Sequence, residues 1–148
     1  MRGSFEAFYS ELSGDWQLTR KISDGSRFEG SARFVEISEN SFCLEETGRL
    51  VLQNSVSLNA MREWQWIYCG NGLLDIRYSA KNGGGVYHQV ELSALENTKG
   101  QSWHGEAIHH CGNDVYAGSY QLAENCLKIR HEINGPKKDL VIKSHFFR

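Results

Sequence analysis

Proline and long apolar runs are nearly missing from this sequence. One proline stands against fifteen glycines in 148 residues, so no proline-rich linker divides the chain, and neither an internal repeat nor a low-complexity run marks a boundary. No stretch approaches the roughly 20 apolar residues of a membrane-spanning helix, and the first residues lack the apolar core of a signal peptide. We therefore expect one domain covering residues 1–148, a cytoplasmic location and no membrane partner.

A strong charge of one sign is also missing. The formal net charge is −2, whereas nucleic-acid-binding domains usually carry a basic excess that contacts phosphates. The four cysteines, Cys43, Cys69, Cys111 and Cys126, are widely spaced and form no C-x-x-C pair. In a chain without an export signal, this spacing favours reduced thiols over disulfides or a closed four-cysteine zinc site. The sequence thus points away from nucleic acid and from a disulfide-stabilised secreted domain.

Residues 4–12 predict one short N-terminal helix. Ser4 is a candidate cap, and the apolar residues from Phe5 to Leu12 follow the spacing of one helix face. After Gly14 the pattern changes to alternating apolar and polar residues, interrupted by turn signals such as Asp-Gly and Asn-Gly-Pro. We expect ten strands, near residues 15–23, 26–37, 42–52, 57–68, 73–79, 86–93, 101–110, 114–122, 126–133 and 138–147.

Many strands joined by short hairpins indicate a meander. A meander this long removes its free edges by closing into a barrel. A β-sandwich is the alternative, but the sequence shows no long crossover connections. The sequence therefore predicts an all-β fold, a single antiparallel up-and-down barrel of about ten strands with the short helix at its start.

The inside of this barrel can be predicted strand by strand, because successive side chains point to opposite faces. The inward set is mostly aromatic and aliphatic. Eight residues with polar groups interrupt it: Arg20, Glu46, Arg62, His88, His109, Asp114, Tyr116 and His131. Burying an unpaired charge is strongly unfavourable, and one glutamate neutralises only one of two arginines. The interior therefore predicts a pocket that accepts an anion.

The first functional hypothesis is a binding module for a small, partly apolar carboxylate or phosphate. Arg20 and Arg62 would bind the anionic group, because a guanidinium suits both anions, and Glu46 would be their partner. The other candidate ligand-binding residues would orient the ligand or form its wall: Trp64, Trp66, His88, His109, Tyr116 and His131. The two tryptophans are equally compatible with core packing. A small molecule is thus the expected partner.

The second hypothesis is an isomerase, lyase or hydrolase that uses the same pocket. His109 would be the acid–base group and Asp114 would orient it. Cys111 is a candidate nucleophile, and Tyr116 completes the set of candidate catalytic residues.

A cofactor is the third hypothesis. His131 or His88 would then be the axial ligand of a haem. A zinc site built from His109, Cys111 and a further histidine is open in principle, although the spacing matches no closed zinc motif.

Two resemblances support the barrel. Gly14-Asp15-Trp16 after a short helix resembles the G-x-W opening of calycins, the superfamily of lipocalins and fatty-acid-binding proteins. In lipocalins an arginine from a late strand lies across that tryptophan, which implies that Arg148 packs on Trp16. Calycins include carriers, haem binders and a few enzymes, so the resemblance implies a fold and leaves the function open.

The longer resemblance, over nearly the whole chain, is to a family of short bacterial proteins of unknown function grouped with the calycins. The matching stretches are Gly14-x-Trp16-x-Leu18-x-Arg20-x-Ile22, Glu46-x-Gly48-x-Leu50, Arg62-x-Trp64-x-Trp66, His88, His109-x-Cys111-x-x-Asp114-x-Tyr116 and Gly135-Pro136-Lys137-Lys138-Asp139. The chain departs from that family at Leu44 and Trp64, where tyrosine is expected, and at Leu140, where an aromatic residue is usual. The resemblance implies the barrel and the inward polar set, and it implies no activity.

Overall fold

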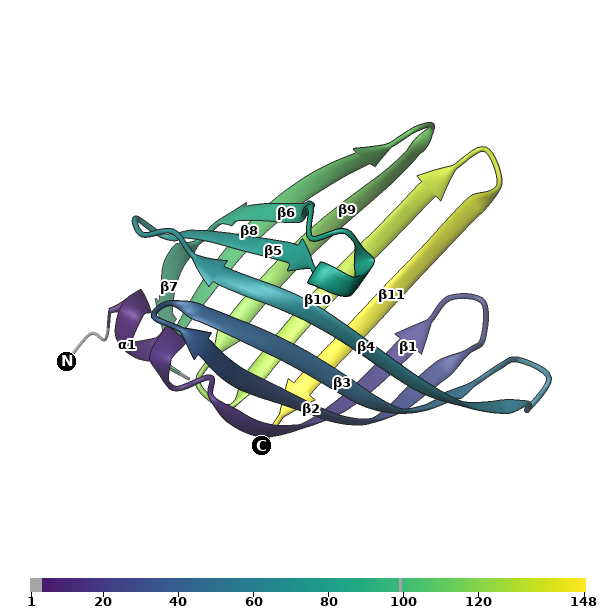
Figure 1. Ribbon diagram of the computed structural model, residues 1–148, viewed down its shortest axis with the longest axis horizontal. Coiled ribbons are helices and arrows are strands. Elements are labelled where there is room, and N and C mark those ends of the chain that lie inside the picture. Colours follow the sequence, from purple (N-terminus) through teal and green to yellow (C-terminus); the bar gives the residue numbers. More distant parts are fainter. Residues whose placement is uncertain (1–3, 99) are drawn as a thin grey trace.

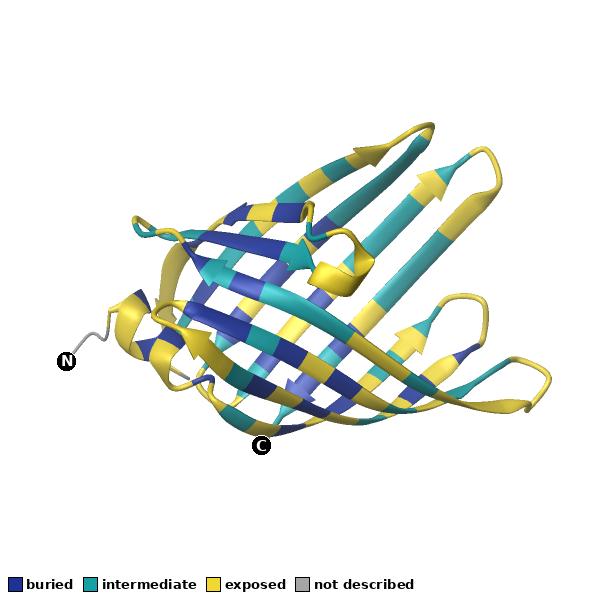
Figure 2. Ribbon diagram, in the orientation of Figure 1, coloured by how far each residue is buried: buried dark blue, intermediate teal, exposed yellow. Residues whose placement is uncertain are grey.

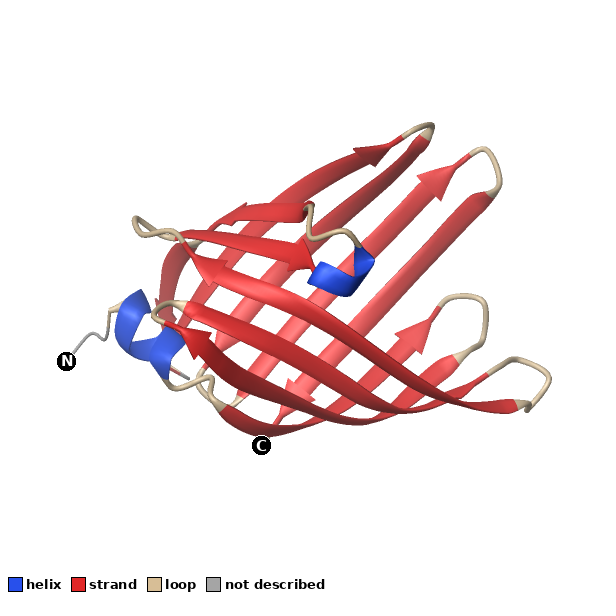
Figure 3. Ribbon diagram, in the orientation of Figure 1, coloured by secondary structure: helices blue, strands red, loops and turns tan. Residues whose placement is uncertain are grey.

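Strands make up most of the chain in the computed structural model, which describes residues 4–98 and 100–148 (Figure 3). The helical elements are α1 (Phe5–Ser10) and the short 3-10 helix η1 (Ala80–Asn82). The strands are β1 (Gly14–Ile22), β2 (Arg27–Ser38), β3 (Ser41–Val51), β4 (Ser57–Tyr68), β5 (Leu73–Tyr78), β6 (Val86–Glu91), β7 (Ser93–Asn97), β8 (Gly100–Cys111), β9 (Asp114–Ala123), β10 (Cys126–Gly135) and β11 (Lys138–Phe147).

The strands form one antiparallel sheet that curls into a barrel (Figure 1). Strands that follow one another in the chain pair with each other, and β1 pairs with β11, so the first and last strands are neighbours. The ladder ends at β6 and β7, which are separated in the chain by Leu92 alone. One bent segment thus pairs with β5 through its first half and with β8 through its second half. The predicted all-β, up-and-down barrel with a short N-terminal helix is confirmed.

Residues 4–98 and 100–148 contain eleven strands where the sequence predicts ten. The additional strand is β7, and each of its five residues is exposed. Its sequence, Ser-Ala-Leu-Glu-Asn, has no β-branched or aromatic residue and buries no face, so it carries neither of the usual strand signals. The strand forms because β6 continues past Leu92 onto β8. Pairing with a neighbouring strand, rather than local preference, determines this element.

Helix α1 closes one end of the barrel. Its cap is Ser4, whose Oγ accepts a hydrogen bond from the Ala7 N–H at 3.1 Å. Phe8 stacks on Trp103 with ring centroids 4.5 Å apart, and the Tyr9 hydroxyl donates to the Trp66 carbonyl at 3.0 Å. Figure 2 shows that buried residues gather toward this end, whereas the hairpin tips at the opposite end are exposed. The apolar core therefore fills the α1 half of the barrel.

Trp16 and Arg148 lie together at the closed end. The Arg148 guanidinium carbon is 4.0 Å from the Trp16 ring centroid, and its Nη1 donates to the Ser13 carbonyl at 3.3 Å. The Trp16 indole N–H donates to the Leu12 carbonyl at 2.9 Å. The packing of the last residue on the first tryptophan is thus as predicted. Within the described residues, no helix has the length and apolar character needed to cross a membrane.

Candidate ligand-binding site

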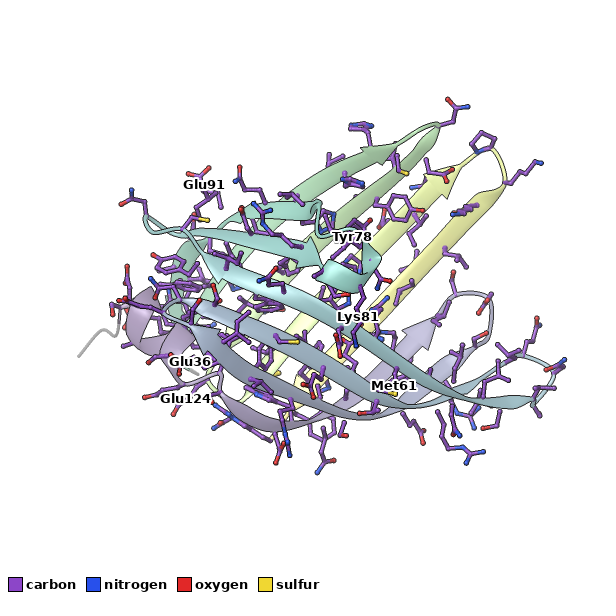
Figure 4. All side chains as sticks on the ribbon, in the orientation of Figure 1. Glu36, Met61, Tyr78, Lys81, Glu91 and Glu124 are labelled. Carbon is purple, nitrogen blue, oxygen red and sulfur yellow. The ribbon has the colours of Figure 1, made fainter. Side chains whose placement is uncertain are left out.

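A cavity of about 660 Å³ occupies the end of the barrel opposite α1. Its volume lies within the range typical of small-molecule sites. The hairpins of the long strands surround it, and η1 lies at its edge beside Tyr78, which ends β5 (Figure 4). Near the entrance the cavity is lined by the aliphatic side chains of Ile22, Leu50, Ile133 and Ile142, and the polar residues lie deeper. The cavity is therefore apolar at the entrance and charged further in.

One buried carboxylate lies at the centre of the charged part. Glu46 is 3% exposed, and its Oε1 and Oε2 accept hydrogen bonds from Arg20 Nη1 and Nη2 at 3.3 and 3.0 Å. Arg20 Nε donates to the Ser144 hydroxyl at 2.7 Å. Arg62 Nε donates to Glu46 Oε1 at 3.2 Å, and this side chain is 45% exposed. All three nitrogens of Arg20 thus donate a hydrogen bond, whereas Arg62 donates through Nε alone and keeps its two terminal NH₂ groups.

The three residues carry an unbalanced charge. Two guanidinium groups share one carboxylate, so the cluster has a net charge of +1. Neither terminal nitrogen of Arg62 has a hydrogen-bond partner within the part of the chain that the structure describes. Arg77 Nε is the single buried side-chain atom there that lacks a partner, so the Arg62 nitrogens are open to the cavity that this residue lines. The cavity wall therefore presents an uncompensated cation with free donors.

A chain of hydrogen bonds runs beside this cluster and fixes the protons on two histidines. His88 Nε2 lies 2.9 Å from the Tyr116 carbonyl oxygen, which can only accept, so Nε2 carries a proton. In neutral His88 the other nitrogen, Nδ1, then accepts from the Tyr120 hydroxyl at 2.6 Å. Because the hydroxyl hydrogen of Tyr120 is already donated to His88, the Tyr120 oxygen accepts a hydrogen bond from His131 Nε2 at 3.4 Å. His131 Nδ1 is therefore left as an unprotonated acceptor.

Both histidines are held in the neutral state that this chain requires. Burial lowers the pKa of His88. Burial, the neighbouring His88 and the two arginines lower the pKa of His131 to about 3. Burial also raises the pKa of Tyr120 well above its ordinary value, so its phenol keeps its proton. His131 Nδ1 has no partner among the described residues, and His131 lines the cavity. The cavity thus offers an acceptor as well as a cation.

Aromatic side chains form the wall facing the arginines. Trp64 stacks on Tyr78 with ring centroids 5.4 Å apart, and Tyr87 lies 5.0 Å from Trp64 and 6.0 Å from Tyr116. The Arg62 guanidinium lies 4.9 Å from the Trp64 ring centroid. This arrangement provides flat apolar surface next to the cation.

Tyr87 is the main residue that the sequence did not identify. Strict alternation places it outside, because its neighbour His88 points in. The ladder between β5 and β6 contains a bulge, with Ile76 opposite His88 and Arg77 opposite Val86, so Tyr87 is the extra residue and is also buried. Burial raises the pKa of its phenol. A Tyr-His pair after three glycines is the one sequence signal that indicates such an irregularity.

A second, smaller pocket lies beneath the charged cluster. It has a volume of about 30 Å³ and shares Arg20, Glu46, Arg62, Trp64, Tyr87 and His131 with the large cavity. Its remaining wall is largely apolar and includes Trp66, which is 1% exposed. A space of this size holds about two water-sized groups. The bulk of a ligand must therefore lie in the outer cavity, against Trp64 rather than Trp66.

The predicted catalytic residues lie at the rim and do not form an acid–base pair. Asp114 is 3.5 Å from Lys138 Nζ, which also donates to the Tyr116 hydroxyl at 3.1 Å. His109 faces the ring of Tyr116 at 6.1 Å, and within the described residues it has no hydrogen bond with Asp114. Cys111 lines the cavity and is exposed. The structure therefore brings these side chains to one edge without the contacts that general acid–base catalysis requires.

The histidines fit the haem hypothesis poorly. Both ring nitrogens of His88 are engaged in hydrogen bonds and the residue is 1% exposed, so it has no lone pair available for iron. His131 has one open nitrogen, Nδ1. The described residues contain no cluster of three or more histidine, cysteine or acidic side chains arranged to bind a metal ion.

Comparison with known proteins identifies a family and a fold. A model described as a family of unknown function (DUF6314) matches residues 12–148. No curated protein sequence matches the chain. An S-type phycobiliprotein lyase, CPES from Guillardia theta, has a similar structure, with a TM-score of 0.63 at 9% identity over 99% of this chain and 93% of that one.

Designed barrels are similar as well. EF1p2_mFAP2b, bound to DFHBI, has a TM-score of 0.53 at 13% identity, covering 98% of this chain and 99% of the other. The redesigned barrel mFAP1, also bound to DFHBI, has a TM-score of 0.50 at 10% identity, covering 95% and 97%. At such identities these likenesses show the shared barrel fold alone.

Proposed function

The chain belongs to a family of unknown function, and from the chemistry of its cavity we propose that it is a binding protein for a small, partly apolar anion. The observation that carries this proposal is the shared carboxylate of Glu46, which leaves Arg62 with two free donors and the cluster with a net positive charge. A carboxylate, phosphate or sulfonate on Arg62 would balance that charge through charge-assisted hydrogen bonds. The aromatic wall next to Arg62 would cover the apolar part of the same molecule.

The free acceptor on His131 further restricts which chemical groups the ligand can carry. An anion alone would leave His131 Nδ1 without a partner in a closed site, which costs free energy. A ligand with a hydroxyl, amine or amide N–H near its anionic group satisfies Arg62 and His131 together. We therefore propose a ligand with both an anionic group and a hydrogen-bond donor. The low pKa of His131 makes it a poor base at neutral pH, which favours binding over proton transfer.

The barrel itself supports this proposal. The designed barrels of similar fold are bound to DFHBI, so a barrel of this kind can bind a small molecule. The packing of Arg148 on Trp16 is the contact that the G-x-W opening of lipocalins implies. We propose on that ground that the chain is a calycin barrel, with its ligand at the end opposite α1.

Two fluorescent probes that differ in charge test the anion site. 8-Anilinonaphthalene-1-sulfonate carries a sulfonate, and N-phenyl-1-naphthylamine is its uncharged counterpart. We expect both to bind and to quench the tryptophan fluorescence of the protein through Trp64. Arg62→Gln should weaken binding of the sulfonate roughly tenfold or more, because it removes charge-assisted hydrogen bonds, and should leave the uncharged probe unaffected.

The matched control is Arg33→Gln, which removes an arginine 60% exposed on the outer wall. Equal sulfonate affinity in the wild type and Arg62→Gln would refute the proposal. Native mass spectrometry of the protein from its own host would then identify any molecule that co-purifies.

A further inference from the structure

The outer wall of the barrel carries a row of cations that the cavity does not explain. Lys21 on β1 lies opposite Lys143 on β11, and Lys143 lies opposite Arg130 on β10. Arg27 on β2 lies on the other side of Lys21. All four side chains are exposed, and β2, β1, β11 and β10 are consecutive in the sheet (Figure 1). Four positive charges thus occupy one line across four neighbouring strands.

The next outward row adds one cation. Lys128 on β10 lies opposite His145 on β11, which lies opposite Thr19 on β1, and Thr19 lies opposite Glu29 on β2. Neighbouring strands are about 4.8 Å apart, and alternate residues of a strand about 6.6 Å apart. Lys128 and the four cations of the first row therefore form an array with spacings of roughly 5 to 7 Å.

Composition does not account for this array. The chain has 16 lysines and arginines and 18 acidic residues, so an even distribution would place acids among the cations. Like charges directly opposite each other in a sheet are destabilising. The two end residues of the first row each pair with an acid two positions along their own strand, Arg27 with Glu29 at 3.9 Å and Arg130 with Glu132 at 2.6 Å. Among the described residues, none of the three lysines has an ion pair.

The array lines a groove. A depression of about 510 Å³ on the outer wall is lined by Lys21, Lys128, Arg130, Lys143 and His145, with Thr19, Ser119 and Gln121 between them. No carboxylate lines it, and every polar side chain that does so can donate a hydrogen bond. It lies on the opposite face of the wall from Arg20, whose side chain points inward to Glu46.

We propose that this groove is a second binding site, for an anion carrying two or more phosphate groups. Each phosphate can neutralise two neighbouring cations of the array, which removes the repulsion between Lys21 and Lys143. The hydroxyls and the amide supply the additional donors that phosphate oxygens accept. A free oligophosphate and a phosphorylated lipid headgroup share this chemistry.

Binding of inorganic tripolyphosphate tests the site. Titration calorimetry at low ionic strength should detect binding that weakens as salt is added. The double variant Lys21→Gln/Lys143→Gln should lower the affinity roughly tenfold, as expected for the loss of two exposed ion pairs. The matched control is Lys81→Gln on η1, away from the groove, which should bind as the wild type does.

Two further measurements separate the sources and the sites. Vesicles of phosphatidylcholine with and without phosphatidic acid distinguish a lipid headgroup from a free phosphate, and binding that depends on Lys21 and Lys143 supports the site in either case. Tripolyphosphate should still bind to Arg62→Gln, which lacks the anion-binding residue of the cavity, and this remaining binding should be lost when Lys21→Gln and Lys143→Gln are added, which separates the groove from the cavity. The double variant loses the repulsion between Lys21 and Lys143, so its urea unfolding midpoint should be at least as high as that of the wild type. This measurement checks that a loss of binding is not caused by unfolding. Failure of tripolyphosphate and vesicles to bind, or equal binding by the double variant, would overturn the proposal.

Discussion

Replacing Glu46 by glutamine should have two effects of opposite sign. The substitution keeps the shape of the side chain and removes the single negative charge between Arg20 and Arg62. Breaking a buried ion pair by neutralising one partner costs about 3–5 kcal/mol. Most of that cost comes from Arg20, because its unpaired charge stays buried with 11% of the side chain exposed. Arg62 is 45% exposed, so water can hydrate its unpaired charge. Urea unfolding should therefore show a loss of stability of about 3–5 kcal/mol.

The same substitution should tighten anion binding. The net charge of the cluster rises from +1 to +2 once Glu46 is neutral. An anion on Arg62, about 6 Å from the lost carboxylate, is relieved of a repulsion of about 3 kcal/mol at an effective dielectric constant near 20. We expect the sulfonate probe to bind roughly tenfold or more tightly, since altered arginine positions offset part of that gain. Saturating probe should then restore part of the lost stability.

Two variants decide whether this reasoning is correct. Asp15→Asn breaks a pair whose partners are 60% and 75% exposed, and it should change stability far less than Glu46→Gln. Arg20→Met combined with Glu46→Leu removes both buried charges and should be less destabilising than Glu46→Gln alone. Unchanged stability in Glu46→Gln, or weaker sulfonate binding, would refute the shared-carboxylate geometry.

Lowering the pH should destabilise the fold through His131, whose folded-state pKa of about 3 lies below the ordinary value of 6.5. The unfolded chain binds that proton first, so stability falls by about 1.4 kcal/mol per pH unit as pH drops between these values. His131→Gln should flatten the urea-derived slope, the exposed His110→Gln being the control; an unchanged slope would contradict the pKa. Gly30→Ala should lower the urea midpoint markedly, because a Cβ at Gly30 overlaps the backbone of β3; wild-type stability would show that this contact is looser. Arg148→Ala should cost about 1 kcal/mol by losing its contact with Trp16, and Arg148→Lys, which keeps the positive charge, should cost less; equal losses would show that the charge contributes nothing and would contradict a cation–π contribution.

Alternation of apolar residues was sufficient to predict the inner face of most strands. Arg20, Glu46, Arg62 and His131 all lie on the cavity wall, and an arginine or glutamate in an apolar series is detectable because burying it is costly. Their role in binding stays a prediction. For His109 alternation is ambiguous, because the strand from 101 to 110 has apolar residues in both of its alternating sets.

Three features of the site depend on information that alternation does not contain. A bulge buries Tyr87, because it is the extra residue in the ladder and lies on the inner face together with its neighbour His88. The state of His131 depends on a hydrogen-bond chain that crosses β6, β9 and β10 and begins at a backbone carbonyl. Asp114 binds Lys138 rather than His109 because the next hairpin along the sheet brings the lysine to the rim. Predicting each of these three features requires knowledge of which residues lie opposite each other on neighbouring strands.

Register also explains why Arg20 and Glu46 meet. Arg20 lies opposite Phe28, which lies opposite Leu50, four residues beyond Glu46 on β3. The ion pair therefore runs diagonally across the inner face, and the position at its midpoint is Gly30 on β2. A Cβ there would overlap the backbone of Thr47 and Gly48 on β3, next to Glu46, so that the strand carrying the carboxylate would have to shift. Glycine at this position thus allows the close approach of β2 and β3 and also keeps the charge cluster in place. Gly30→Ala should consequently lower both stability and sulfonate affinity, whereas a defect in packing alone would lower stability and leave affinity unchanged.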